Sequence, residues 1–302
     1  MRTSVNQGVL WALGTTVVSG FSVYVNKFGV SQVPDAFVYT TIKNSLVVIG
    51  LLTAVGLFAG WQEMRQFTRR QWAGWFGLGL IGGGVPFLLF FQGLSMASAP
   101  SAALIHKTLF LWVALLGAPL LREKLGSWQL AGLGILAIGI FLLQPPSGWG
   151  WGQGENLILI ATLLWAVETI LAKKVLAGIT PRTAALGRMG VGVLIMWAFL
   201  ALTGRAGPAL ALNGTQWFWV AVTSLFLMAY VWTWYSALKA APATLVTSVL
   251  TLAAIITILL TAVFEGRAMS GLQVAAMVLM VSGAAAFILR LPRRVTTVVE
   301  AG

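Results

Sequence analysis

The sequence predicts an all-α integral membrane protein in which ten transmembrane helices form two inverted five-helix repeats around a central cavity. Three observations lead to this fold class. The chain of 302 residues is 59% hydrophobic and only 9% charged, whereas an ordinary soluble domain has roughly 25% charged residues. The apolar residues fall into segments long enough to cross a bilayer. The pattern of these segments then occurs a second time along the chain.

The composition also narrows the function. The formal net charge of +12 would suggest a nucleic-acid partner in a soluble protein, but here the Lys and Arg residues fall mostly between apolar segments. There they indicate membrane topology, and no nucleic-acid partner is expected. With no Cys, one His and seven acidic residues, the chain excludes a disulfide framework, a zinc ribbon and a thiol nucleophile. No metal or other cofactor is expected.

The apolar segments have the length that a bilayer requires. A hydrocarbon core of about 30 Å takes roughly 20 residues at about 1.5 Å of rise each. In lipid the backbone must satisfy its own hydrogen bonds, and the segments carry no alternating barrel pattern, so each is predicted to be a helix. The ten expected helices span about 7–26, 36–60, 72–96, 99–121, 127–144, 155–175, 182–203, 215–238, 241–264 and 270–290.

The basic residues predict the orientation of these helices. If the N-terminus is cytoplasmic, the outer connections hold only Lys27, Arg205 and Arg267. Thirteen basic residues then lie on the inner connections and tails: Arg2, Arg65, Arg69, Arg70, Arg122, Lys124, Lys173, Lys174, Arg182, Lys239, Arg290, Arg293 and Arg294. This positive-inside bias predicts a multi-pass protein of the inner membrane with both termini cytoplasmic.

A spacing that occurs twice indicates an internal repeat. Pro100 precedes Glu123 by 23 residues, and Pro242 precedes Glu265 by the same number. The segments QLAGLGILAIG and QVAAMVLMVSG follow the two glutamates. Apolar helices can match by chance, but the equal Pro-to-Glu spacing favours duplication.

The repeat implies two halves, residues 1–150 and residues 151–302. Each half contains five expected helices, and five is an odd number. The halves must therefore cross the membrane with opposite orientation. This inverted arrangement recurs in secondary transporters, in which the substrate site lies between the halves near the bilayer midplane.

The segments LLREKLGSWQLAGLGILAIGIFLL and VFEGRAMSGLQVAAMVLMVSGAAAFIL resemble the helix–Glu–helix motif that ends each half of EamA family members, in the drug/metabolite transporter superfamily. The resemblance covers nearly the whole chain and implies an exporter of amino acids or related metabolites. Within the family, the aromatic content favours an aromatic amino acid exporter of the YddG type. The loop after Glu265 is two residues longer than the loop after Glu123, which leaves the repeat register open.

Charged side chains inside the bilayer are the first candidates for a site. Each costs at least about 2.5–3.5 kcal/mol at a helix centre unless it has a partner or a hydrated cavity. Glu168 and Arg188 are expected at similar depth. They either form a structural ion pair or leave Glu168 to hold a substrate ammonium group or a proton. Lys43, His106 and Lys107 are expected in the other half of the membrane, where they either attract a carboxylate or serve a structural role.

Deep aromatic residues form the second group of candidates. Trp165 lies one turn before Glu168, and Tyr39 one turn before Lys43. Trp112, Tyr230 and Trp234 complete the set of expected substrate-binding aromatics, with the last two on one helix face. These rings either stack on a flat substrate or pack between helices.

A run of glycines before a proline interrupts the third expected helix. Gly83 and Pro86 are the structural or gating candidates there, together with Arg188. Proline removes a backbone donor and glycine permits bending or close approach. Close packing of small residues against another helix is the alternative explanation.

These features predict a transporter that exports small metabolites from the cytoplasm by alternating access between the two repeats. The expected substrates are amino acids that are aromatic or amphipathic. The expected partners are a small-molecule substrate and the lipid bilayer, and the oligomeric state is not predicted. Exporters of other small drugs or metabolites, such as nucleosides or cationic aromatics, are the alternative. An intramembrane enzyme is disfavoured, because Glu168 and His106 are expected at different depths.

Overall fold

The computed structural model describes residues 5–58, 60–145 and 151–289, which form helices and connecting turns. Helices of the first half cross the molecule five times. These spans are α1 (Val5–Gln32), α2 (Ala36–Leu57), the broken third span α4–η1–α5 (Arg69–Leu78, Gly79–Gly84 and Val85–Leu94), the broken fourth span α6–α7 (Ala99–Lys107 and Leu109–Leu120), and α8 (Ser127–Leu143). The short helix α3 (Gly60–Arg65) connects the second and third spans.

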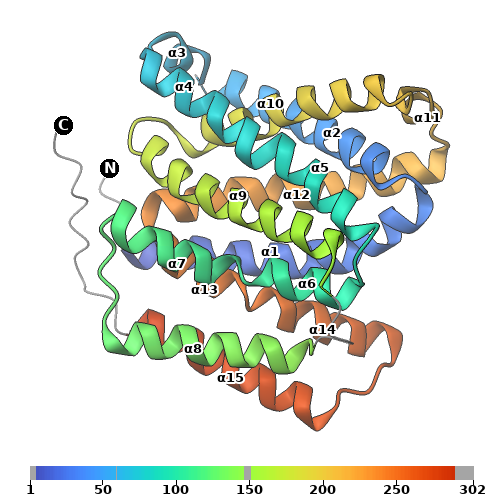
Figure 1. The fold of residues 1–302 in the computed structure, drawn as a ribbon. Helices are drawn as coiled ribbons and strands as arrows, with labels where there is room; N and C mark the ends of the chain where they lie inside the picture. The colour runs from blue at the N-terminus through green and yellow to red at the C-terminus, as the bar shows by residue number, and fades with distance from the viewer. Residues whose placement is uncertain (1–4, 59, 146–150, 290–302) are drawn as a thin grey trace.

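The second half repeats this order. Its spans are α9 (Gln153–Val175), α10 (Pro181–Leu202), α12 (Gly214–Ala240), the broken span α13–α14 (Ala243–Leu250 and Ala253–Glu265), and α15 (Gly271–Leu289). The short helix α11 (Ala206–Leu210) lies between α10 and α12. In Figure 1, α1 and α9 enter from opposite sides of the molecule, and so do all later spans that correspond to each other. The two halves are therefore inverted.

The length and hydropathy of the helices confirm the predicted fold class. Nine helices of the described chain are long and apolar enough to cross a membrane, and the shorter apolar helix Ser127–Leu143 is the tenth. The helix α8 has 17 residues, which is at the short end of the range for a membrane-spanning helix. The first span ends at Gln32, later than the expected residue 26, because the helix continues through Asn26 and Gly29 and stops just before Pro34.

The helix packing follows the inverted repeat. α8 packs along α15 and α2 along α10, so that equivalent helices of the two halves meet one another, and α7 packs along α13, which belongs to the equivalent span of the other half. The remaining large contacts come in related pairs: α1 packs against α12 as α9 packs against α5, and α1 packs against α14 as α9 packs against α7. Each of these contacts therefore has an equivalent in the opposite orientation.

The sequence sets the helix starts through side-chain caps. Asp35 accepts hydrogen bonds from the amides of Phe37 and Val38 at the start of α2. Thr68 and Asn213 form capping boxes at the starts of α4 and α12. Such caps satisfy backbone donors that the first helical turn leaves free.

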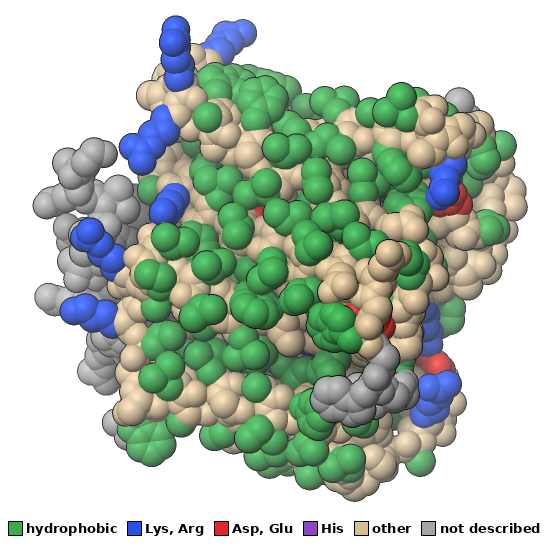
Figure 2. All heavy atoms as spheres, in the orientation of Figure 1, with side chains coloured by type: hydrophobic (Ala, Val, Ile, Leu, Met, Phe, Trp, Pro, Cys, Tyr) green, Lys and Arg blue, Asp and Glu red, His purple; other side chains and the backbone are tan. Residues whose placement is uncertain are grey.

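The surface has an apolar belt and one strongly basic end. Figure 2 shows hydrophobic side chains spread over the whole face, with Lys and Arg gathered along the left-hand edge and further basic side chains beside Asp and Glu at the right-hand edge. Large apolar side chains such as Leu202 and Leu289 are 88% and 80% exposed, as expected of a surface that faces lipid. We call the end of the molecule where α1 begins and α15 ends the basic end, and the opposite end the far end.

Candidate functional site

The broken third span leaves a backbone carbonyl free for other helices. In an α-helix, the carbonyl of Gly82 would accept from the amide of residue 86, but Pro86 has no N–H. The π-helix η1 accommodates this break. The Gly82 carbonyl instead accepts the indole N–H of Trp165 at 3.0 Å and the Nε–H of Arg188 at 3.3 Å. The predicted interruption therefore connects the third span to α9 and α10.

Gly83 allows α10 to approach the broken span closely. A Cβ atom at Gly83 would lie 1.8 Å from the carbonyl oxygen of Arg188, and one at Gly192 would lie 2.3 Å from the Gly83 oxygen. Only glycine fits such a backbone contact. The surroundings of Gly83 therefore match the close-packing explanation, and this contact holds Arg188 beside the broken span.

Glu168 and Arg188 form the expected pair between α9 and α10. An Arg188 Nη1 atom lies 4.0 Å from Glu168 Oε2, and the two residues are only 8% and 1% exposed. The Tyr235 hydroxyl from α12 donates to Glu168 Oε1 at 2.5 Å. The glutamate therefore has two partners within the protein. Sequence reasoning missed Tyr235, although the aromatic run from residue 230 to 235 contained it.

An aromatic cluster lies directly beside this pair. The ring of Trp165 is 5.3 Å from Phe87, 5.5 Å from Phe90 and 4.9 Å from His106, measured between centroids. Phe90 also contacts His106, at 5.3 Å. The cluster brings together α5, α6 and α9. His106 therefore lies much closer to the Glu168 region than its expected depth implied, because both adjoin Trp165. Phe87 and Phe90 were not predicted.

His106 and Lys107 end α6 at the break in the fourth span. Both side chains are partly exposed. The buried Nδ1 atom of His106 has no hydrogen-bond partner, and Lys107 makes neither a hydrogen bond nor an ion pair within the described residues. The break follows at Thr108, whose hydroxyl donates to the Ile105 carbonyl at 2.6 Å and accepts from the indole N–H of Trp112 at 3.0 Å. Trp112 therefore supports the break.

Lys43 lies in a separate polar cluster of α1, α2 and α12. Its ammonium group donates to Asn26 Oδ1 at 3.0 Å and lies 5.0 Å from the centre of the Tyr39 ring. The Tyr39 hydroxyl oxygen lies 2.8 Å from both Asn26 Oδ1 and Thr223 Oγ1, within hydrogen-bond distance of each. Tyr39 is 0% exposed, so it supports the Lys43 cluster from within the protein interior. Its predicted contact with a substrate stays a prediction.

Tyr230 and Trp234 stack on one face of α12, as their spacing predicted. Their ring centroids are 6.0 Å apart with an interplanar angle of 14°. Trp234 is 2% exposed and its Nε1 atom has no hydrogen-bond partner. Glu168 and Arg188 are the charged neighbours of Tyr230. Tyr230 therefore lies near the Glu168–Arg188 pair, as Trp165 does, whereas Trp234 is buried among the helices.

The two ends of the molecule are closed to different degrees. At the basic end, every residue of α13 from Ala243 to Val249 is buried. At the far end, the equivalent helix α6 buries only Ala102 and Ile105 among its described side chains. The basic end is therefore closed by the fully buried start of α13, whereas the far end, where α6 leads to His106, is less well packed.

Carboxylates join the two halves at the basic end. Glu63 accepts from the Thr180 amide at 2.5 Å and from the hydroxyls of Thr180 and Thr183 at 2.7 and 2.6 Å. Glu123 accepts from the amides and one hydroxyl at the start of α13. Both carboxylates bind the beginning of a helix, where free amides and the helix dipole favour negative charge.

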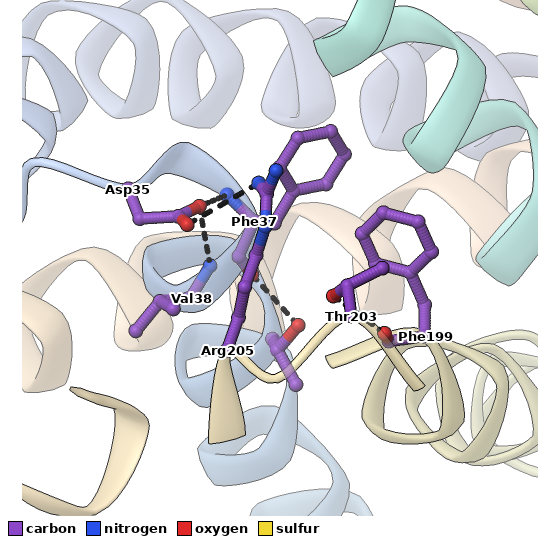
Figure 3. A network of polar contacts seen from close by, with 7 residues as sticks. Asp35, Phe37, Val38, Phe199, Thr203 and Arg205 are labelled. Atoms are coloured by element: carbon purple, nitrogen blue, oxygen red, sulfur yellow. Dashed lines mark hydrogen bonds and ion pairs between the residues drawn. The ribbon is translucent and has the colours of Figure 1, made fainter. Parts of the chain in front are cut away.

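Exposed ion pairs join the halves at the far end. Arg205 reaches Asp35 at 3.3 Å across the start of α2, as Figure 3 shows. The Arg205 guanidinium also lies 5.1 Å from the Phe37 ring centre and 6.0 Å from that of Phe199. Lys27 forms a second ion pair, with Glu265.

A hollow of about 230 Å³ lies outside this region, between α2 and α12. Its lining is almost wholly apolar and consists of Leu46, Val47, Gly50, Ala221, Ser224, Leu225 and Met228. None of the predicted site residues lines it. The candidate site is therefore the junction of α5, α6, α9 and α10 around Trp165, and not this hollow.

The fold and this junction define a class: a polytopic helical membrane protein whose two inverted halves meet at a polar and aromatic cluster within the membrane. The model of the EamA-like transporter family matches residues 6–144 and again residues 152–289. The chain therefore belongs to the EamA-like transporter family, which confirms the resemblance inferred from the helix–Glu–helix segments.

Two further comparisons agree with this membership. An uncharacterized transporter of Archaeoglobus fulgidus is 23% identical over 190 residues, which is 63% of this chain and 63% of that protein. The match thus spans just under two thirds of the relative's length. A solved crystal structure superposes with a TM-score of 0.78 at 20% identity, covering 94% of this chain and 97% of the other. At this identity the likeness shows the fold alone.

Proposed function

We propose that this protein exports small amphipathic metabolites that carry a carboxylate, above all aromatic amino acids, from the cytoplasm by alternating access between its two halves. The observation that carries the proposal is the junction around Trp165. There, an aromatic cluster adjoins a buried Glu168–Arg188 pair and includes His106, whose Nδ1 atom has no hydrogen-bond partner. Lys107 follows His106 at the end of α6 without a hydrogen bond or ion pair in the described residues.

The charge of the junction favours a substrate with a carboxylate. Lys107 and Arg188 are both charged neighbours of His106, and Glu168 already has Arg188 and Tyr235 as partners. An unpaired cation inside a bilayer costs at least about 2.5–3.5 kcal/mol. A substrate carboxylate beside Lys107 would offset that cost. A cationic aromatic would instead meet repulsion.

The aromatic rings supply the second half of the recognition. Phe87 and Phe90 contact Trp165 at interplanar angles of 75° and 54°, so ring edges and faces border one region. A flat apolar side chain gains contact area there without needing a charge. An amino acid with an aromatic side chain offers both the carboxylate and the ring in one small molecule.

The proposal includes a domain division and an orientation. The repeats comprise residues 1–150 and residues 151–302, and they rock against each other about the junction. Both termini are cytoplasmic and the protein resides in the inner membrane. The gathering of Lys and Arg at the basic end supports this orientation, because cytoplasmic connections carry the excess of basic residues.

Counterflow in proteoliposomes tests the proposal. Vesicles loaded with unlabelled Phe, Tyr or Trp are expected to accumulate labelled Phe, and 2-phenylethylamine, which has the ring and the amine but no carboxylate, is expected not to compete. Lys107→Gln should raise the KM for Phe about tenfold or more, because a charge-assisted contact is lost. Lys174→Gln removes an exposed cation at the basic end and serves as the matched control.

Two results would contradict the proposal. Protein that passes sugar phosphates but ignores Phe, Tyr and Trp has another substrate class. Equal KM values for the Lys107→Gln and Lys174→Gln variants would remove Lys107 from carboxylate recognition.

A further inference from the structure

The two glutamates that mark the internal repeat make different contacts in this structure. Glu123 accepts from the Ala243 amide at 2.6 Å, from the Thr244 amide at 3.1 Å and from the Thr244 hydroxyl at 2.7 Å. It thereby binds the first turn of α13 in the other half. Glu265, its equivalent, forms an ion pair with Lys27 instead. The same motif is therefore engaged with a helix start at the basic end only.

The chain around each glutamate differs accordingly. α7 ends at Leu120, and Arg122 then adopts a left-handed backbone conformation with φ of +55°, which brings Glu123 out of the helix. Such a conformation is unfavourable for a residue with a Cβ atom, so the surroundings must hold it in place. α14 instead continues through Glu265, and the left-handed turn follows at Gly266 with φ of +66°. Glycine adopts this turn at no steric cost.

The helices that these glutamates could join show the same difference. α7 and α13 pack together at the basic end, whereas α6 and α14 lack comparable packing at the far end. Pro242 precedes α13 as its N-cap residue and provides no side-chain cap, so the start of α13 depends on Glu123. α6 carries its own cap, because the Ser98 hydroxyl accepts from the Ser101 amide at 3.2 Å. The start of α6 is thus complete without Glu265.

We infer that Glu123 and Glu265 are alternating gate residues, and that Glu265 leaves Lys27 to bind the start of α6 when the far end closes. Its expected partners are the amide and hydroxyl of Ser101, which Glu265 would take over from the Ser98 hydroxyl; Ser101 follows Pro100 as Ala243 follows Pro242. Glu123 then releases α13. In an inverted repeat each half adopts in one state the arrangement that the other half has in the opposite state.

This role rests on the proposed alternating access. It assigns a function to the repeated Pro-to-Glu spacing of 23 residues. The spacing places the carboxylate of each half at the depth of the proline-started helix of the other half. It also explains why Lys27, at the far end of α1, stands beside Glu265: the ion pair holds the carboxylate away from α6 while that end is open.

Two variants of the same ion pair separate a gate from a static surface contact. The chain has no Cys, so Ala103→Cys on the partly exposed face of α6 gives a single reporter for a membrane-impermeant maleimide. Glu265→Gln should raise the labelling rate, because the closed far end loses its carboxylate. Lys27→Gln should lower it, because Glu265 is released to bind α6. Each change is expected to be about two- to fivefold.

A static ion pair predicts a different result, since both variants break the same contact. Changes in the same direction, or no change in either variant, would overturn the inference. A second measurement is disulfide formation between Ser101→Cys and Glu265→Cys, expected to accumulate during transient closures even without the carboxylate, because gating brings the two positions together and the disulfide traps them. The control pair Ser101→Cys and Thr261→Cys, one helical turn away, should not cross-link. Equal cross-linking of both pairs, or of neither, also counts against the gate.

The labelling needs no substrate, so it can fail independently of the proposed function. Opposite labelling shifts without Phe counterflow would leave the gate intact and remove the substrate class. Phe counterflow with identical shifts in both variants would leave the transport proposal intact and remove the gate.

Discussion

The tight backbone contact between the two halves at Gly83 makes Gly83→Ala the most informative stability test. A Cβ atom at Gly83 would lie 1.8 Å from the Arg188 carbonyl oxygen and within 3.1 Å of the Gly192 Cα atom. Both neighbours are backbone atoms of α10, so a change of rotamer cannot relieve the overlap. The helix α10 must therefore move away from the broken third span.

The expected cost follows from this movement. An ordinary carbon–oxygen contact needs well over 3 Å, so α10 must shift by more than about 1 Å. That shift lengthens the 3.3 Å bond from Arg188 to Gly82, which is already at the long end for a hydrogen bond. Overpacking alone costs about 1–3 kcal/mol, and losing the bond of a buried charged group adds about 1.5–3 kcal/mol. We expect Gly83→Ala to lose at least about 3 kcal/mol of stability.

Thermal unfolding of the purified protein in detergent measures this loss. Gly134→Ala is the matched control, because a Cβ atom at Gly134 in α8 meets nothing within 4 Å. There, replacement of a helical glycine should stabilise by up to about 1 kcal/mol. The two Gly→Ala substitutions should therefore shift the unfolding temperature in opposite directions. A Gly83→Ala protein as stable as the Gly134→Ala protein would refute the reasoning from backbone contact.

Four further substitutions test single contacts. Tyr235→Phe removes a donor from the buried Glu168 carboxylate and should destabilise the protein by about 1–3 kcal/mol in the same unfolding assay; an unchanged unfolding temperature would contradict that bond. Trp165→Phe keeps a ring but loses the bond to Gly82, so counterflow should fall far more than folded yield; parallel losses would indicate a packing role only. Glu123→Ala should cost about 1–2 kcal/mol, as loss of a helix cap does, whereas Glu265→Ala should cost under about 1 kcal/mol because its ion pair is exposed. Equal costs would contradict the difference between the two ends.

The fold was predictable because lipid imposes simple rules on the chain. Each span must satisfy its own backbone and be long enough to cross, so length and hydropathy determine the helices. The short helix α8 is still recognised as a membrane span from the sequence, because its apolar segment is uninterrupted. The odd number of spans in each half then determines the inversion. None of these steps needs knowledge of contacts between distant residues.

The candidate site was predictable only where a side chain is unusual for its surroundings. Glu168 and Arg188 stand out because charge in a bilayer needs a reason. Phe87 and Phe90 were missed because Phe is an ordinary residue in an apolar helix, and only the tertiary structure shows that they meet Trp165. The free carbonyl of Gly82 could have been found, since a proline four residues later always leaves the carbonyl without its helical donor.

The breaks in the fourth and ninth spans lacked a comparable sequence signal. The hydroxyl of Thr108 donates to Ile105, and that of Thr251 donates to Ser248, each three residues back at the point where the helix is interrupted. Threonine in a helix often donates to a preceding carbonyl without breaking it. The sequence therefore cannot distinguish these two positions from Thr257 or Thr261, which donate four residues back within an unbroken helix.

The chemistry of the junction predicts an order of selectivity. A site that binds a polar group of its substrate rejects analogues without that group by up to about 10⁴–10⁵-fold, because its own polar group is left unpaired. Differences between apolar side chains of similar size change selectivity by only about 10–200-fold. At the junction Lys107 has no partner in the described chain, whereas the rings of Phe87 and Phe90 both already contact Trp165. The ratio of transport efficiencies between Phe and 2-phenylethylamine should therefore exceed the ratio between Phe and Trp in the same vesicles. If the choice of ring mattered more than the carboxylate, recognition would rest on the aromatic cluster, and the unpaired lysine would need another explanation.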